Sequence, residues 1–211
     1  NKSILDINIK QLASSGVDNV IIAVGYLGEI IETVIGNGDK YGIKINYSYE
    51  DQPLGTVGGL ALMKNLLEDK FIVMNGDILH NLDFDILFKD HIHSKRQVTI
   101  TTYTQHHTVR LGVLEVHDKN IIKYIEKPTN EYVVSMGIYV LNKYIIEIFV
   151  KEKNYLDFPT LINTLIQNQK KINSYMHEGL WIDIGTTEEY LNLVENLDEI
   201  IEKNPLIPIS I

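Results

Sequence analysis

Two aspartates at the ends of predicted strands are the residues of this sequence best placed to do chemistry. Asp77 follows the apolar run Phe71–Met74, and Asp183 closes a second short run that begins at Trp181. Ligands of α/β sheets lie beyond the carboxyl ends of strands, where these two carboxylates can converge. Such a pair suits Mg²⁺, which usually takes its other ligands from water and substrate phosphate. Each aspartate taken alone is explained about equally well by a turn or a helix cap.

A glycine-rich stretch, residues 50–59, has the composition of a nucleotide-binding loop. It contains Pro53, Gly55, Gly58 and Gly59, and it lies between a predicted strand and a helix expected to run to about residue 67. Glycine allows a backbone to approach a flat ligand closely, and N–H groups at a helix start bind anions. The stretch has neither the Walker lysine nor G-x-G-x-x-G spacing, so a plain turn remains the alternative.

An acid and a base stand side by side at Glu126 and Lys127, directly before Pro128. In an acidic protein such a lysine can pair with substrate phosphate, while the glutamate accepts hydrogen bonds from sugar or ribose hydroxyls. A surface turn is the commoner explanation of this pattern. Gly137 interrupts the strand-like run 132–140, which often marks the close approach of a ligand or another backbone.

Two further patterns are weaker. Asp83 and Asp85 match the D-x-D of metal-dependent glycosyltransferases, but they follow a strand end and fit the cap and first turn of a helix. The histidine pairs at 91 and 93 and at 106 and 107 lack carboxylate or cysteine neighbours at metal-site spacing, so we expect them to be solvated.

The elements that must position these residues alternate between helix and strand in the first half of the chain, and strands dominate the second half. We predict an α/β fold, a Rossmann-like three-layer α/β/α sandwich with a mixed, mostly parallel sheet and a β-rich second half. Residues 1–211 should form one domain. Hydrophobic periodicity predicts helices over about 3–15, 27–35, 83–93, 143–150, 158–169 and from 186, and strands over 19–24, 43–47, 71–74, 97–104, 111–116, 121–126, 132–140, 172–177 and near 181–183.

Composition excludes several classes of function. A formal charge of -9 argues against a nucleic-acid-coating surface, and the absence of cysteine removes disulfides and thiolate chemistry. No apolar run approaches the roughly 20 residues that span a bilayer, so we expect no membrane partner. A cytoplasmic location is the default expectation, and a homo-oligomer remains possible.

Five motifs in order along the chain resemble the sugar-nucleotide pyrophosphorylases, the nucleotidyltransferases that join a sugar 1-phosphate to a nucleoside triphosphate. The first motif, with P-L-G-T followed by a small residue and glycine, is most similar to that of the mannose-1-phosphate guanylyltransferase group. The similarity covers nearly the whole chain. The motifs are E-D-Q-P-L-G-T-V-G-G from Glu50, N-G-D ending at Asp77, E-K-P from Glu126, S-M-G-I-Y from Ser135 and W-I-D-I-G-T from Trp181.

The resemblance implies a role for each matching residue. Asp77 and Asp183 would hold Mg²⁺ and, with Lys127, form the catalytic group. A sugar phosphate oxygen would attack the α-phosphorus of the triphosphate in line and expel pyrophosphate, a transfer that depends on positioning and charge neutralisation. The nucleotide would contact Pro53, Leu54, Gly55, Thr56, Gly58 and Gly76, and the sugar 1-phosphate would contact Glu126, Lys127, Gly112 and Gly137.

The chain also departs from the pattern. The resemblance implies a strand, a G-G-x-G-T-R loop that grips the triphosphate, and a P-K-P segment, all before the helix that starts near Ser3, and this sequence contains none of them. We expect a fragment that lacks its first strand and phosphate loop and is weak or inactive as a catalyst; a degenerate relative is the alternative. Two other functions stay open, a non-catalytic sugar-nucleotide-binding or regulatory module and a metal-dependent glycosyltransferase that uses Asp83 and Asp85.

Overall fold

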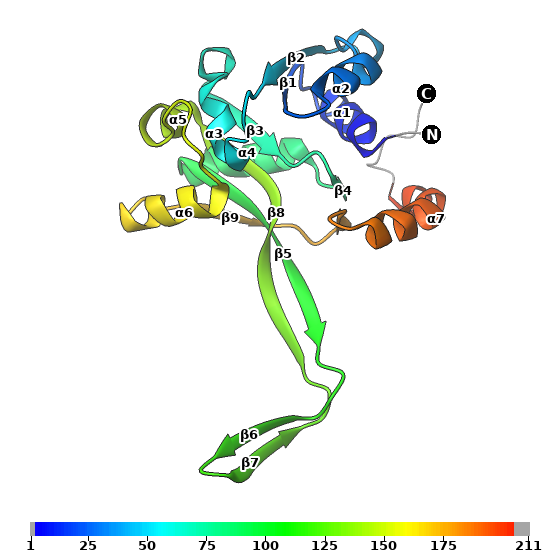
Figure 1. Ribbon diagram of the computed structural model, residues 1–211, viewed down its shortest axis with the longest axis vertical. Helices are drawn as coiled ribbons and strands as arrows, with labels where there is room; N and C mark the ends of the chain where they lie inside the picture. The colour runs from blue at the N-terminus through cyan, green and yellow to red at the C-terminus, as the bar shows by residue number, and fades with distance from the viewer. Residues whose placement is uncertain (1–2, 205–211) are drawn as a thin grey trace.

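An α/β body with a long β arm is the arrangement seen in a computed structural model of the protein, which describes residues 3–204 (Figure 1). The arm extends from one side of the body, and all the helices belong to the body. The helices are α1 (Ile4–Ser14), α2 (Gly28–Ile35), α3 (Gly55–Gly58), α4 (Phe84–Ser94), α5 (Lys143–Phe149), α6 (Phe158–Gln167) and α7 (Thr187–Lys203). The strands are β1 (Asn19–Val24), β2 (Lys44–Tyr49), β3 (Lys70–Met74), β4 (Ile78–His80), β5 (Val98–Thr108), β6 (Val113–His117), β7 (Asn120–Ile125), β8 (Thr129–Asn142), β9 (Asn173–Met176) and β10 (Trp181–Asp183).

The predicted α/β architecture is confirmed, and most elements lie where hydrophobic periodicity places them. Local capping explains several helix starts. The Ser3 hydroxyl accepts a hydrogen bond from the backbone N–H of Asp6 at the start of α1. Thr186 and Glu189 form the predicted capping box before α7.

The stretch after the glycine-rich loop contains less helix than expected. In place of a helix to about residue 67, the structure has the single turn α3 and two 3₁₀ turns, Gly59–Ala61 and Lys64–Leu66. Another 3₁₀ turn covers Asp39–Tyr41. Glycine is among the poorest helix formers, and three of them in the first five residues after Leu54 leave little to sustain a longer helix.

Strand pairing within the described residues is mixed, but parallel pairs are not the majority. The largest sheet has the order β3-β8-β5-β9, and β8, one of its two inner strands, is antiparallel to both neighbours. Only β1–β2 and β5–β9 are parallel among residues 3–204. The expectation of a mostly parallel sheet came from strand–helix alternation in the first half, and it is wrong because β3 pairs with the distant β8.

Two clusters of the core pack on the body half of β8. Ile138, Val140 and Leu141 are fully buried, and they pack with α4 on one side and with α5 and α6 on the other. This burial fixes the end of β3 and, with it, the position of Asp77.

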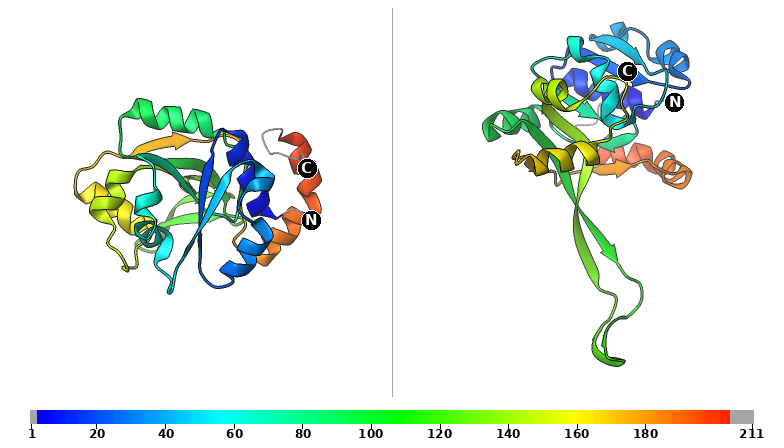
Figure 2. Two further views of the ribbon diagram at one scale, coloured as in Figure 1. Left: turned by 90° about the horizontal axis from the view of Figure 1, so that it is seen from above. Right: turned by 60° about the vertical axis from the view of Figure 1, so that its left-hand side comes forward.

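The other half of β8 leaves the body. It continues its pairing with β5 as a two-stranded ribbon, which leads to the hairpin of β6 and β7 (Figures 1 and 2). We call residues 109–128, from the end of β5 to the start of β8, the arm tip. Every residue of β6 and β7 is exposed. No helix in residues 3–204 is long and apolar enough to cross a bilayer.

Candidate functional site

The two predicted carboxylates come together across the ladder of β4 and β10. Asp183 is the register partner of Ile78, and the backbone N–H of Ile184 donates to the carbonyl of Asp77 at 3.2 Å. Both aspartate side chains are exposed at the end of this ladder. Strands separated by about a hundred residues in sequence thus place one carboxylate each at the same edge.

Electrostatic repulsion marks this pair. Partial burial, the negative charge of Asp77 and that of Glu189 raise the pKa of Asp183 above its ordinary value. A cation between the carboxylates would relieve that repulsion. The donor set therefore fits a hard divalent ion, and since residues 3–204 contain no cluster of three or more metal-ligating side chains, most ligands would be water and substrate phosphate.

Buried polar side chains of α1 hold the β4 strand in place. The Asn8 amide donates to the carbonyl of Ile78 at 3.0 Å, and the Gln11 amide donates to that of Leu82 at 3.1 Å. The His80 Nδ1 accepts from the backbone N–H of Leu82 at 3.2 Å, so Nε2 carries the proton. Burial and the nearby His177 lower the pKa of His80 to about 4.

The glycine-rich loop is fastened to residues 154–158. The backbone N–H groups of Val57 and Gly58 both donate to the carbonyl of Leu156 at 3.0 Å, and the Thr56 hydroxyl accepts from the N–H of Phe158. Gly55 has φ +77°, and a Cβ there would lie 2.5 Å from the Leu156 carbonyl oxygen. Position 55 therefore requires glycine, because another backbone segment approaches it closely.

The loop leaves only part of its surface for a ligand. The Leu54 side chain is buried, its N–H donates to the Glu50 carboxylate at 3.0 Å, and its carbonyl accepts from Leu156. Gly58 is buried as well, whereas Pro53 and Thr56 are exposed. A nucleotide contact at this loop therefore falls on the exposed members.

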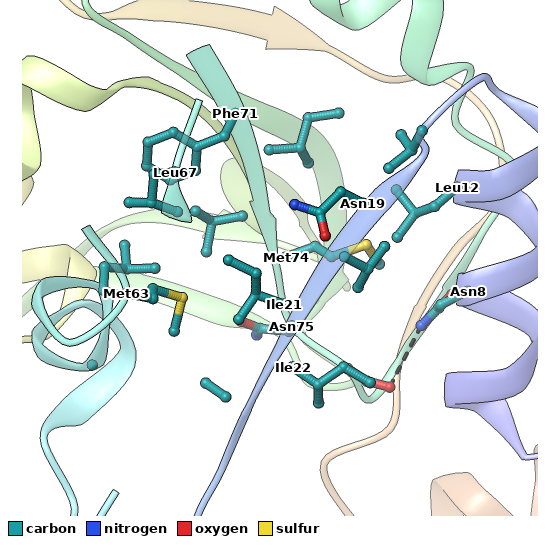
Figure 3. A pocket seen from close by; sticks show the side chains of 18 of the residues that line it. Asn8, Leu12, Asn19, Ile21, Ile22, Met63, Leu67, Phe71, Met74 and Asn75 are labelled. Atoms are coloured by element: carbon teal, nitrogen blue, oxygen red, sulfur yellow. Dashed lines mark hydrogen bonds between the residues drawn. The ribbon is translucent and has the colours of Figure 1, made fainter. Parts of the chain in front are cut away.

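A cleft of about 840 Å³ separates β1 from β3 and brings three predicted nucleotide residues together. Gly55, Thr56 and Gly76 all line it. Apolar side chains from both strands, including those of Ile21 and Phe71, form its walls (Figure 3). Within residues 3–204, β1 pairs only with β2, and β3 pairs only with β8. Each of the two strands therefore has an unpaired edge on the side of the cleft.

Gly137 lies beside the carboxylate strand end and not at the arm tip. Its φ is +76°, and a Cβ would lie 2.7 Å from the Asn75 amide nitrogen. The Asn75 N–H donates to the Gly137 carbonyl at 2.9 Å. The close approach predicted from this glycine is thus made, at least in part, by Asn75.

The other predicted sugar residues lie at the base of the arm tip. Glu126 and Lys127 connect β7 to β8, and the Glu126 carboxylate accepts a hydrogen bond from the Tyr124 hydroxyl at 2.9 Å. A Cβ on Gly112 would collide with the same hydroxyl. Gly112, Glu126 and Lys127 therefore form one cluster, which the β5–β8 ribbon separates from β4 and β10 (Figure 1).

The patterns judged weaker have structural explanations. The Asp83 carboxylate caps α4 by accepting from the N–H groups of Asp85 and Ile86, and Asp85 pairs with Lys89. His91 is not solvated as expected. It is buried, and its ring bonds to Thr99 and Asn142 at 2.8 Å each.

Sequence reasoning missed the polar residues that support the site. Asn8 and Gln11 lie on the buried face of α1. Because both are polar, a search for apolar periodicity does not detect them. The signal that could have found them is an amide side chain on the apolar face of a predicted helix. A buried amide must find hydrogen-bond partners, and an irregular backbone nearby can supply them.

The comparison with protein families shows to which family the chain belongs. The model of the nucleotidyl transferase family matches residues 1–199. The chain belongs to this family. Its members are enzymes, as the resemblance in the five motifs implies.

The relatives that the chain matches within this family include guanylyltransferases of sugar 1-phosphates. The chain is 32% identical over 209 residues to a D-glycero-alpha-D-manno-heptose 1-phosphate guanylyltransferase from Aneurinibacillus thermoaerophilus, covering 95% of this chain and 87% of the relative. It is 30% identical over 223 residues to a mannose-1-phosphate guanyltransferase from Yarrowia lipolytica, covering 100% of this chain but only 60% of the longer relative.

Solved structures agree on the fold. The crystal structure of HddC from Yersinia pseudotuberculosis matches with a TM-score of 0.67 and 26% identity, over 90% of this chain and 83% of that one. HddC in complex with GMP-PN matches with a TM-score of 0.72 and 24% identity, over 93% and 86%.

Replacing a loop glycine should destabilise the protein. Gly55→Ala should lower the free energy of unfolding by on the order of 2 kcal/mol or more, because alanine combines a positive φ with a collision at the Leu156 carbonyl. Gly76→Ala is the matched control, since a Cβ there meets nothing nearer than 3.9 Å. Urea unfolding measures both, and equal effects would contradict this account of the loop.

Stability should fall in acid because of His80. In the unfolded chain His80 takes up a proton near pH 6.5, but in the fold only near pH 4, so its contribution is lost as pH falls through that window. His80→Gln should flatten the dependence of unfolding free energy on pH between about 6.5 and 4. His93→Gln, at an exposed position of α4, is the matched control for replacing a histidine.

Proposed function

We propose that the protein transfers a guanylyl group from GTP to a sugar 1-phosphate and so makes a GDP-linked sugar. The observation that carries the proposal is the Asp77–Asp183 pair at the end of the β4–β10 ladder. The names of the relatives support guanine and a manno-configured hexose or heptose 1-phosphate. The GMP-PN complex of HddC supports a guanine nucleotide as one ligand.

In the proposed reaction an oxygen of the sugar phosphate attacks the α-phosphorus of GTP. A new P–O bond forms as the bond to the β-phosphate oxygen breaks, and pyrophosphate leaves with the bonding electrons. Asp77 and Asp183 would hold Mg²⁺, which when bound neutralises phosphate charge. Thr56, Pro53 and Gly76 would position the nucleotide, and Lys127 would pair with the sugar phosphate.

The cleft between β1 and β3 supports the expectation of a further strand. Two unpaired strand edges and apolar walls are what an inserted strand needs, because it would pair its backbone on both sides and bury its side chains. The family resemblance places such a strand, and the phosphate loop after it, ahead of Ser3. We therefore propose that turnover depends on a strand that fills this cleft.

Removing either carboxylate should abolish most of the activity. Asp77→Asn and Asp183→Asn should each lower turnover by about 10² or more, since each removes one preorganised charge of the reacting centre. The measurement is release of pyrophosphate from GTP and mannose 1-phosphate or heptose 1-phosphate.

The control for this experiment is Asp85→Asn. It keeps the fold and the α4 cap, and it should leave turnover within about twofold, because a surface ion pair contributes little. The glycosyltransferase hypothesis predicts the opposite ranking. Magnesium-dependent binding of GDP-mannose in calorimetry without any pyrophosphate release would favour the non-catalytic binding module.

A further inference from the structure

The arm tip exposes apolar side chains on both faces of its hairpin. Ile122 and Tyr124 are 60% and 63% exposed, and Leu114, the register partner of Tyr124, is also exposed. Val113 and its partner Ile125 lie on the opposite face, because successive residues of a strand point to opposite sides. A lone two-stranded hairpin is at best marginally stable in water, so both faces call for a covering surface.

The arm also keeps part of the predicted site away from the rest. Between Thr102↔Ser135 and Thr108↔Thr129 the β5–β8 ribbon pairs without a register shift. Six residue steps at about 3.3 Å hold Glu126 and Lys127 roughly 20 Å beyond the body. The shift between Ile100 and Thr102 lies at the body end. Rotation of the arm tip about its base would not bring Lys127 to the Asp77 of its own chain while these pairs persist.

Charge favours the body of another molecule as the partner. The arm tip has four cationic residues, Arg110, Lys119, Lys123 and Lys127, against three acidic ones, Glu115, Asp118 and Glu126, whereas the whole chain has a net charge of -9. The Asp77–Asp183 pair and the acidic start of α7, Glu188 and Glu189, form a negative region. Opposite charges on arm and body steer two copies together.

We propose that the arm tip docks on a second copy of this chain and brings Glu126 and Lys127 to that copy's Asp77–Asp183 pair. A two-fold axis makes the exchange reciprocal, so each body receives one arm and both apolar hairpins are covered. The docking follows from the exposed surface and the ribbon alone. The role of Lys127 toward a sugar phosphate rests on the proposed function.

The first test is the oligomeric state. Sedimentation should give two chains per particle at micromolar concentration. Ile122→Lys should shift the protein to single chains, by at least tenfold in dissociation constant, because it buries a charge in the interface. Ile166→Lys, at an equally exposed position of α6, should leave the dimer intact. A monomeric wild type overturns the proposal.

The second test identifies the receiving surface without relying on activity. Protein labelled with ¹⁵N is unfolded and refolded with unlabelled protein, then treated with a carbodiimide that joins lysine to carboxylate. Peptides that contain Lys127 should be linked to peptides with Asp77, Asp183 or Glu188 in mixed-isotope form. Linkage within one isotope only would show that the arm folds back on its own body and would overturn the proposal.

The last test separates arm exchange from the proposed function. Asp77→Asn and Lys127→Ala variants, each inactive alone, should regain about a quarter of wild-type turnover when refolded together, because half of the dimers are mixed and each holds one intact site. Mixed-isotope links in a wild type that neither binds GTP nor turns it over would reject the proposed function and keep the exchange. Wild-type turnover without recovery in the mixture would reject the exchange.

Discussion

The three-residue ladder of β4 and β10 is the constraint on which the site depends. It joins the middle of the chain to its end, and little backbone pairing holds it. The surrounding contacts supply what the ladder lacks, since Ile78 and Leu79 are fully buried and the Trp181 indole donates to the carbonyl of Met136 at 3.2 Å. The Asn81 side chain accepts from the N–H of Leu180 at 2.7 Å and closes the other end. Two mutually repelling carboxylates can be held at one edge because buried side chains and these hydrogen bonds hold both strands in place.

Local features of the fold were predictable from the sequence, whereas long-range pairing was not. Helix α1 and strand β1 follow from apolar periodicity and caps, which depend on neighbours within a few residues. The antiparallel pairing of β3 with β8 depends on residues some seventy positions apart, and an apolar run has no signal for direction. The same limit applies to the arm. The β-rich run 97–104 predicts a strand, but nothing in it says that the strand continues to Thr108 and leaves the body.

Part of the candidate site was predictable for a similar reason. The Asp77–Asp183 convergence followed from the rule that sites gather at strand ends, and the structure brings the two together. The loop glycines were interpreted as room for a ligand, yet at Gly55 and Gly58 the close neighbours are the backbone atoms of residues 154–156. Sequence shows that a backbone must come close to a glycine, but it does not show whose atoms approach. The loop can pack against residues 154–158 and still belong to the site. That packing holds Thr56 at a defined place on the cleft.

The body has a pair of negative charges at β4 and β10, and the arm tip has a small excess of positive charge. Partial burial raises the pKa of Asp183, and the negative charges of Asp77 and Glu189 raise it further, so the ionised carboxylate pair is unfavourable without a cation. A pair of this kind is tolerated where a cation binds, because the ion turns repulsion into attraction for both oxygens. Phosphate groups bound there would also need positive charge on their far side, which Lys127 at the base of the arm tip can supply in the proposed dimer. An acidic protein that handles anionic substrates can in this way keep its few useful cations on an element that closes over the site from outside.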